Sequence, residues 1–297
     1  MILVFGGGGQ LGQELVRTAK ARAIPLTALT HAQADLTDAS AVARVIARFR
    51  PAAVVNAAGY TKVDLAETEL DEARQGNELG PALLAQACAA ARLPLVHVST
   101  DYVFDGTKPS AYTETDAPCP TNVYGRTKLA GEEAIRHRLN SHVILRTAWI
   151  YSEFGHNFLK TIVRLASTRD ELRVVSDQRG NPTSTRQLAD AILRILPRLL
   201  SEEQLWGTYH FTGTGVTTWH GFASRIVAAQ APLTGRHPVV TAITSAEYPI
   251  AARRPANSAL DCARFAQVFG FRAGPWPEEA DAVTRALIES RITTHVA

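Results

Sequence analysis

The first twelve residues constrain the fold of this chain more than any other stretch. Residues 2–5 form an uninterrupted apolar run, which is typical of a strand buried on both faces of a parallel sheet. Gly6, Gly9 and Gly12 follow at regular spacing, and residues 14–22 have the composition of a helix. Glycines let a diphosphate approach the backbone, and a helix start offers it free N–H groups. We therefore predict dinucleotide binding rather than a bare tight turn.

The same order of strand and helix repeats through the first half of the chain. Further apolar runs are separated by stretches with helical periodicity. Alternating strands and helices are characteristic of a parallel sheet that helices cover on both faces. We therefore predict an α/β fold built on a Rossmann-type doubly wound parallel sheet. Its later strands are expected at residues 26–29, 53–56, 95–98 and 142–146.

The pattern becomes less regular after Tyr151, where we predict a smaller C-terminal α/β lobe that binds the substrate. Residues 1–150 would form the NAD(P)-binding Rossmann domain, and residues 151–297 would form the smaller lobe. Two strands of the second half, near residues 172–176 and 208–212, are expected to return to the main sheet.

The composition argues against several classes of function. The net charge is +3 and the arginines are scattered, so we expect no nucleic-acid partner and no membrane partner. The three cysteines and nine histidines lack the spacing of disulfide frameworks or metal sites, which favours a reducing compartment such as the cytoplasm. No apolar run approaches the ~20 residues that cross a bilayer. The first residues also lack the features of a signal peptide.

Two residues four positions apart mark the start of a predicted helix. Tyr124 and Lys128 would lie on one helix face, with Cβ atoms ~5–6 Å apart. We expect the ammonium to favour phenolate and so lower the tyrosine pKa from its usual ~10, which would suit a proton donor. Taken alone, such a pair is more often part of a solvated helix surface. Ser99 and Thr100 add hydroxyl groups at the end of a strand, where ligands bind in open α/β sheets.

The residues that would select the dinucleotide leave its identity open. The second predicted strand ends in Thr30 and His31, which offer neither an acid for a ribose 2′-hydroxyl nor an arginine for a 2′-phosphate. Asp35 could contact the adenine, and a role in starting the next helix explains it equally well. Ala57 and Ala58 follow the third strand and are small enough for a cofactor to pass close to the backbone.

The glycine turn, Thr100 and the Tyr124/Lys128 pair occur together and in this order. The combination resembles the extended short-chain dehydrogenase/reductase superfamily over nearly the whole chain. Within the superfamily, several stretches are similar to the dTDP-4-dehydrorhamnose reductase family. They are residues 99–106, 122–132, 146–151, 177–183 and 253–260.

The resemblance implies a set of site residues. The catalytic residues would be Thr100, Tyr124 and Lys128. The residues around the cofactor, NADPH or NADH, would be Gly6, Gly9, Gln10, Leu11, Asp35, Leu36, Ala57, Ala58, Tyr124 and Lys128. The residues around a nucleotide sugar would be Tyr102, Val103, Trp149, Asn157, Gln178, Pro182 and Arg253.

The implied reaction is the reduction of the C4 ketone of dTDP-4-dehydro-L-rhamnose to dTDP-L-rhamnose. The hydride would come from the nicotinamide and the proton from Tyr124, while Thr100 hydrogen-bonds the carbonyl oxygen. Lys128 would also hold the nicotinamide ribose hydroxyls. Arg253 would pair with the diphosphate of the sugar nucleotide, because the guanidinium fork suits phosphate.

Three other functions share parts of this pattern. A nucleotide-sugar 4,6-dehydratase needs an acidic side chain where this chain has Tyr102, so elimination is disfavoured. A 4-epimerase with tightly bound NAD uses the same pair of Tyr124 and Lys128 and stays open. A non-catalytic subunit resembling the regulatory β subunit of methionine adenosyltransferase also stays open.

The resemblance also bears on metal binding and assembly. Some relatives are thought to use Mg²⁺ held by glutamates at a dimer interface. This chain has Arg186 and Gln187 before Leu188, where one such acid would be expected. We therefore predict no metal site, and a homodimer is expected only if it does not depend on one.

Overall fold

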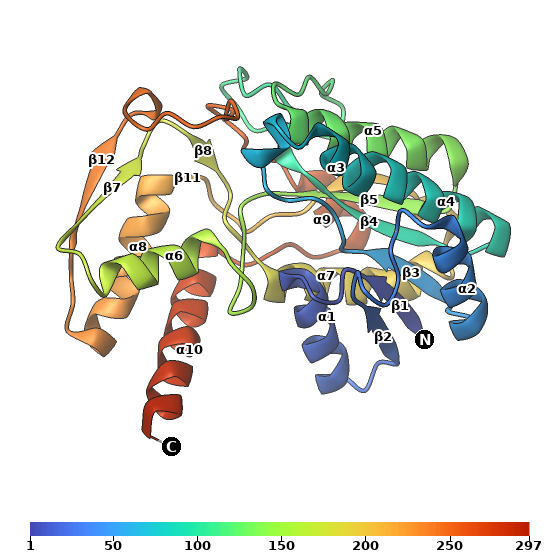
Figure 1. The fold of residues 1–297 in the computed structure, drawn as a ribbon, viewed down its shortest axis with the longest axis horizontal. Coiled ribbons are helices and arrows are strands. Elements are labelled where there is room, and N and C mark those ends of the chain that lie inside the picture. The colour runs from blue at the N-terminus through green and yellow to red at the C-terminus, as the bar shows by residue number, and fades with distance from the viewer. Residues whose placement is uncertain (297) are drawn as a thin grey trace.

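Six parallel strands form one sheet in the larger lobe of the molecule (Figure 1). The computed structural model describes residues 1–296. The strand order is β10-β5-β4-β3-β1-β2, and every neighbouring pair is parallel. The predicted Rossmann-type sheet is thus confirmed. Its strands are β1 (Ile2–Phe5), β2 (Leu26–Leu29), β3 (Ala53–Asn56), β4 (Leu95–Thr100), β5 (His142–Thr147) and β10 (Gly207–His210).

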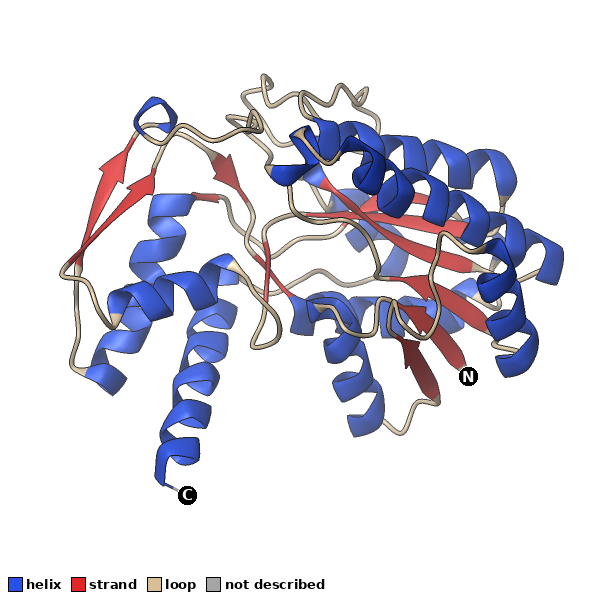
Figure 2. Ribbon diagram, in the orientation of Figure 1, coloured by secondary structure: helices blue, strands red, loops and turns tan. Residues whose placement is uncertain are grey.

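Helices cover both faces of this sheet, as the layers in Figure 2 show. One face packs against α2 (Ala39–Phe49), α4 (Gly80–Ala91) and α5 (Val123–Arg138). The other packs against α1 (Gln10–Ala21), α7 (Thr185–Leu199) and α9 (Ala263–Phe269). The sequence explains this burial, because each helix carries an apolar stripe. In α1 the buried positions Leu11, Leu15 and Ala19 recur every four residues along one face.

The long helical region before Arg92 is divided by an irregular turn. It consists of α3 (Leu70–Arg74), a π-helical segment (Gln75–Leu79) and α4. Asn77 in that segment is fully buried, and its Nδ2 donates to the carbonyl oxygen of Tyr60 at 3.0 Å and to Thr127 Oγ1 at 3.2 Å. These bonds connect the segment to α5, on the side of the sheet that carries Tyr124.

The smaller lobe has its own apolar core. The helices α6 (Phe158–Ala166), α8 (Trp219–Thr234) and α10 (Trp276–Val296) pack together with a parallel pair of strands, β7 (Glu171–Val175) and β12 (Val239–Ile243). Four two-residue strands form two further pairs, one parallel and one antiparallel. They are β6 (Ile150–Tyr151), β8 (Arg179–Gly180), β9 (Thr183–Ser184) and β11 (Thr217–Thr218).

Only one of the two strands predicted to return to the main sheet does so. β10 pairs with β5, as predicted from residues 208–212. The prediction for residues 172–176 is wrong, because β7 pairs with β12 in the smaller lobe. Leu172 and Val174 of β7 are buried there against α8, and β10 already occupies the edge of the central sheet beside β5.

The packing does not divide at residue 150. Three later elements, α7, β10 and α9, belong to the core of the central sheet. The predicted division into residues 1–150 and 151–297 therefore separates the two lobes only in part. Ala297, the last residue of the predicted lobe, lies outside the described residues. In the described chain, 1–296, no helix is both long and apolar enough to cross a membrane.

The turn between β1 and α1 generates a test of stability. A Cβ at Gly12 would lie 2.2 Å from the carbonyl oxygen of Gly6 and 2.7 Å from Gly7 Cα. Helix propensity alone would favour Gly12→Ala by at most ~1 kcal/mol, whereas overpacking costs about 1–3 kcal/mol. We expect Gly12→Ala to lower the free energy of unfolding, measured by urea denaturation without ligand.

The matched control is Gly8→Ala in the same turn. A Cβ at Gly8 would meet only Thr30 Cγ2, at an ordinary 3.8 Å. We expect this variant to unfold at nearly the urea concentration of the parent protein. Equal stability of the two variants would contradict the close-packing explanation.

Candidate active site

A large cleft of about 1800 Å³ runs along the carboxyl edge of the central sheet and is bounded by α6 and β7 of the smaller lobe. Pockets for one small ligand usually measure ~300–1,000 Å³, so this cleft has room for two ligands. The cleft contains most of the predicted site residues. Those that line it are Gly6, Gly9, Gln10, Leu11, Asp35, Leu36, Ala57, Ala58, Thr100, Tyr102, Tyr124, Lys128, Trp149, Asn157 and Gln178.

The glycine turn forms one end of the cleft, where the strand order reverses between β1 and β3. Gly6 has a φ of +91°, and a Cβ there would lie 2.6 Å from the backbone of Ala57 and Ala58. Gly9 precedes α1 and brings no side chain to cap the first N–H groups of the helix. These features fit the diphosphate of a dinucleotide, which needs close approach to backbone N–H groups at a helix start.

The structure is compatible with both roles that the sequence allowed for Asp35, contact with the cofactor and a structural role before α2. Asp35 lines the cleft, and its Oδ1 accepts hydrogen bonds from the backbone N–H and the hydroxyl of Thr37, both at 2.8 Å. These bonds hold the pKa of the Asp35 carboxyl below its ordinary value. The cap of α2 itself is Asp38, which accepts from two N–H groups of the first turn.

Thr100, Tyr124 and Lys128 converge on the middle of the cleft from two elements. Thr100 ends β4, and the other two lie on the first two turns of α5. Asn122 fixes the start of this helix, because its Oδ1 accepts a hydrogen bond from the backbone N–H three residues on, at 2.7 Å. Lys128 Nζ donates to the carbonyl oxygen of Val98 at 2.7 Å.

The prediction that Lys128 lowers the pKa of Tyr124 is wrong for this structure. Burial raises the pKa of Tyr124 to about 12, against smaller opposing effects of a hydrogen bond with Thr100 and the charge of Arg254. Lys128 is also buried, which lowers the pKa of its ammonium to about 8. Tyr124 is therefore held as the phenol, which is the form that can donate a proton.

A buried carboxyl group, absent from the predicted site, adjoins Thr100. Thr100 Oγ1 donates to Asp101 Oδ1 at 3.0 Å and accepts from the backbone N–H of Tyr102 at 3.1 Å. Burial raises the pKa of Asp101 to about 7. Asp101 follows Thr100 in the sequence, but only the tertiary structure shows that its carboxyl group is buried.

Tyr102 stands beside Tyr124 in the cleft. The two rings meet edge to face, with centroids 5.8 Å apart and planes at 81°. Burial raises the pKa of the Tyr102 phenol above its ordinary value. Because such a phenol does not ionise near neutrality, it cannot serve as the base that an elimination at this position would need.

Two stacked tryptophans line the end of the cleft that belongs to the smaller lobe. Trp149 and Trp219 have ring centroids 3.6 Å apart and planes within 7° of parallel. Trp149 has a φ of +47°, an unusual conformation for a bulky residue, and a Cβ at Gly180 would lie 2.5 Å from its ring. Trp219 was not among the predicted site residues, because nothing in its local sequence shows that it packs against Trp149.

Of the two adjacent arginines in this loop, Arg254 lines the cleft and Arg253 does not. Arg254 lines the cleft, pairs with Asp64 at 2.7 Å, and lies 5.7 Å from the centre of the Tyr102 ring. Arg253 is exposed outside the cleft, and its carbonyl oxygen accepts from Asn122 Nδ2 at 2.9 Å. The structure therefore places Arg254, and not the predicted Arg253, on the wall of the cleft.

Two further predicted residues, Val103 and Pro182, also lie outside the cleft. Val103 is fully buried and packs with Phe104, Tyr112 and Leu260. Pro182 is buried too, and its carbonyl oxygen would lie 2.2 Å from a Cβ at Gly213. A neighbouring predicted residue lines the cleft in each case, Tyr102 beside Val103 and Gln178 in the loop before Pro182.

A fully buried carboxylate below the cleft joins the elements that carry these side chains. Glu132 accepts from Arg146 at 2.7 and 2.9 Å, from Arg136 at 2.6 Å and from Ser99 at 2.5 Å. Burial would raise the pKa of Glu132, but the two arginines outweigh it and hold that pKa below its ordinary value. Removing one partner of a buried ion pair costs about 3–5 kcal/mol, so this cluster fixes β4, β5 and α5 against one another.

Across residues 1–296, no group of three or more His, Cys, Asp or Glu side chains could hold a metal ion. Arg186, at the position where the sequence lacked an expected acid, forms an ion pair with Glu153.

A protonated phenol beside an ammonium and a hydroxyl, at the carboxyl edge of a doubly wound sheet, suits the transfer of a hydride to or from a carbonyl. The fold and the cleft together place the protein among the extended short-chain dehydrogenases/reductases, which are NAD(P)-dependent oxidoreductases.

Comparison with known proteins narrows this class. The chain belongs to the family described as the RmlD substrate binding domain, which matches residues 1–288. It is 42% identical to a dTDP-4-dehydrorhamnose reductase from Sinorhizobium fredii, over 97% of each chain.

Solved structures agree with this assignment. A dTDP-4-dehydrorhamnose reductase from Clostridium acetobutylicum matches with a TM-score of 0.90 at 36% identity, over 96% of this chain and 99% of that one. The Bacillus anthracis enzyme of the same name, in complex with NADP, matches with a TM-score of 0.87 at 34% identity, over 95% and 97%. The family resemblance seen in the sequence is thus confirmed.

The buried carboxyl group of Asp101 generates a pH-dependent prediction. Its pKa is about 7 in the folded protein and 3.8 ordinarily, so the folded state binds this proton more tightly than the unfolded chain does. The contribution of the protonated Asp101 to the free energy of unfolding is fully present below pH 4, and it is lost as the pH rises to about 7. We expect Asp101→Asn to raise the free energy of unfolding at pH 8 by up to about 4 kcal/mol, and to have little effect at pH 4. Urea denaturation at the two pH values measures this.

Asp105, four residues further on, provides a control of opposite sign. It accepts hydrogen bonds from Tyr112 and Thr107, which hold its pKa below the ordinary value. Asp105→Asn should therefore lower the stability at pH 8. If Asp101→Asn behaved like Asp105→Asn, the raised pKa of Asp101 would be contradicted.

Proposed function

We propose that the protein reduces the C4 ketone of dTDP-4-dehydro-L-rhamnose to dTDP-L-rhamnose with NADPH or NADH. The observation that carries this proposal is the convergence of Thr100, Tyr124 and Lys128 in a cleft large enough for a dinucleotide and a nucleotide sugar together. Membership of the family and the names of the two reductases from Sinorhizobium fredii and Clostridium acetobutylicum support the substrate. The Bacillus anthracis complex with NADP supports the cofactor.

The glycine turn would hold the diphosphate of the dinucleotide, with Gln10 and Leu11 at the start of α1 and Ala57 and Ala58 opposite. The bound dinucleotide supplies the hydride. Lys128 has three N–H donors and uses one for the carbonyl oxygen of Val98. Two donors therefore remain to bind hydroxyl groups of the nicotinamide ribose.

Tyr124 delivers the proton to O4 of the sugar. Burial keeps its phenol protonated, and the cleft brings the hydroxyl of Thr100 close to it. As negative charge develops on O4, a hydrogen bond from Thr100 becomes stronger and orients the oxygen toward Tyr124. Thr100 changes its acceptor from Asp101 to the substrate in this step.

The nucleotide sugar occupies the part of the cleft between the lobes. Trp149, supported by Trp219, offers a flat apolar face, and Asn157 and Gln178 offer amide groups. Arg254 would pair with the diphosphate, since it lines the cleft and its guanidinium is only partly neutralised by the half-exposed Asp64.

We also propose that the enzyme works in the cytoplasm and forms a homodimer. Cys88, Cys119 and Cys262 are free thiols, which supports a reducing compartment. Size-exclusion chromatography with light scattering tests the dimer.

A direct assay tests the reaction. Purified protein is mixed with NADPH or NADH and with dTDP-4-dehydro-L-rhamnose, and the absorbance of the reduced nicotinamide is followed. We expect sugar-dependent oxidation of at least one dinucleotide. The absence of sugar-dependent oxidation with both NADPH and NADH would contradict the proposal. Co-purifying NAD together with epimerised product would instead favour a 4-epimerase, and a stoichiometric partner without turnover would favour a regulatory subunit.

The variant Tyr124→Phe tests the proton donor. Losing a general acid lowers turnover by about 10²–10⁴-fold, whereas the cleft keeps its shape and should bind NADPH nearly as before. Turnover is measured by the same assay, and binding by nucleotide fluorescence.

The matched control is Tyr112→Phe, which removes a tyrosine hydroxyl bonded to Asp105 and Lys108, outside the cleft. It should leave turnover largely intact. Full activity of Tyr124→Phe would show that another group donates the proton.

A further inference from the structure

The segment 152–157 lies directly on the start of α1. It connects β6 to α6, and its residues Gly155, His156 and Asn157 line the cleft. Gln10 Oε1 accepts hydrogen bonds from Ser152 Oγ at 3.1 Å and from Asn157 Nδ2 at 2.9 Å. The segment therefore packs on the residue that follows the glycine turn.

The segment is shaped by hydrogen bonds of its own. Asn157 Nδ2 also donates to the carbonyl oxygen of Ser152 at 2.8 Å, and Asn157 Oδ1 caps α6 by accepting from the N–H of Lys160 at 3.0 Å. Gly155 has a φ of +58°, and a Cβ there would lie 3.0 Å from Gln10 Cγ. The backbone thus comes close to α1 at a position where a larger residue would be strained.

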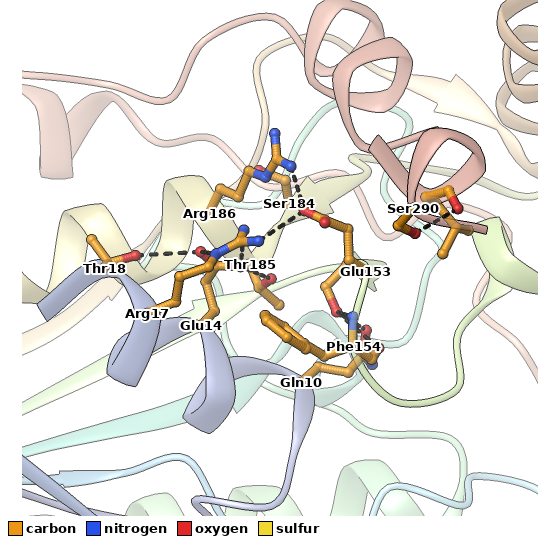
Figure 3. Close-up of polar contacts among 12 residues, drawn as sticks. Gln10, Glu14, Arg17, Thr18, Glu153, Phe154, Ser184, Thr185, Arg186 and Ser290 are labelled. Atoms are coloured by element: carbon orange, nitrogen blue, oxygen red, sulfur yellow. Dashed lines mark hydrogen bonds and ion pairs between the residues drawn. The ribbon is translucent and has the colours of Figure 1, made fainter. Parts of the chain in front are cut away.

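Glu153 fastens the segment to Arg17 and Arg186 (Figure 3). Its carboxylate accepts from Arg17 of α1 at 3.0 Å and forms an ion pair with Arg186 of α7. Arg17 is itself held by the buried Glu14, at 2.7 and 3.0 Å. Burial would raise the pKa of Glu153, but the hydrogen bonds from the two arginines outweigh it and hold that pKa below its ordinary value.

The cluster is electrically balanced, with two carboxylates and two guanidinium groups. Arg17 also lies 5.1 Å from the ring centre of Phe154, so the segment is bound through both its charged and its aromatic side chain. Neither Glu153 nor Arg17 lines the cleft. They can therefore affect a ligand only indirectly, by fixing the position of residues 155–157, which do line the cleft.

We infer that Glu153, held between Arg17 and Arg186, is a positioning residue that fixes the 152–157 segment over the start of α1 and so sets the affinity for the dinucleotide. The inference rests on the proposed function, which places the cofactor diphosphate at that helix start. A side chain outside the cleft would then control cofactor binding, while the chemistry stays with residues inside it.

The test compares two variants that each remove one carboxylate paired with an arginine beside α1 and α7. Glu153→Gln keeps the shape of the side chain and removes its charge. Asp190→Asn does the same at the far end of α1, where Asp190 of α7 pairs with Arg22 and touches no residue of the segment in the contacts of the described chain. The dissociation constants of NADPH and NADH are measured by nucleotide fluorescence, which needs no sugar substrate, and thermal unfolding is followed in parallel.

We expect Glu153→Gln to raise the dissociation constant by about five- to tenfold, as the loss of a charged hydrogen bond at a partly buried site should. Its melting temperature should be similar to that of Asp190→Asn. Asp190→Asn should bind the dinucleotide like the parent protein. Arg186→Gln, which removes the other side of the contact, should weaken binding as Glu153→Gln does.

Equal affinities of Glu153→Gln and Asp190→Asn would overturn the inference, as would a loss of melting temperature without a loss of affinity. Should Glu153→Gln fail to fold, unchanged affinity of Arg186→Gln would overturn it as well. If the parent protein bound neither dinucleotide, the proposed function would fail and this inference with it. If the parent protein binds and only the variants fail to differ, the proposed function stands.

Discussion

The contact between the glycine turn and the end of β3 is the constraint on which the site depends. In a parallel sheet, the chain leaves β1 and β3 side by side at the carboxyl edge, and both exits compete for the same space. Gly6 resolves this competition, because a Cβ there would lie 2.6 Å from the backbone of Ala57 and Ala58. The glycine turn can therefore lie against Ala57, and Gln10 and Leu11 at the start of α1 line the cleft.

This placement of α1 also determines how the two lobes meet. Gln10 at its start and Arg17 two turns on both bind the segment that enters the smaller lobe. The lobes are thus connected through a helix whose position was fixed by the glycine turn. A displacement of α1 would therefore move both the glycine turn and residues 155–157, which line the same cleft.

On the other face of the sheet, buried polar groups fix the reactive side chains. Glu132 lies one turn after Lys128, and Ser99 precedes Thr100, so one hydrogen bond between Ser99 and Glu132 connects the two elements. Burying a carboxylate is costly unless charges pair with it, and Arg146 and Arg136 supply that pairing. The same burial that requires these partners also keeps Tyr124 protonated, because a phenolate would be poorly solvated there.

Much of the fold could be predicted because its signals are local. The apolar run from Ile2 to Phe5, the glycines after it and the capping residue Asn122 before Tyr124 each favour the conformation of their own stretch. The strand at 172–176 was predicted correctly as a strand, but its partner was not. Hydrogen bonds between strands join residues far apart in sequence, and β7 alone does not show which edge is free.

The class of fold could thus be predicted from the sequence alone, and so could the presence of the glycine turn, Thr100, Tyr124 and Lys128 in one cleft. Only the tertiary structure decided that Arg254 faces the cleft instead of Arg253, and that Trp219 supports Trp149. It also reversed the expected shift of the Tyr124 pKa. The physical reason is common to all three: the direction of a side chain and its loss of solvent depend on segments that meet only when the chain has folded.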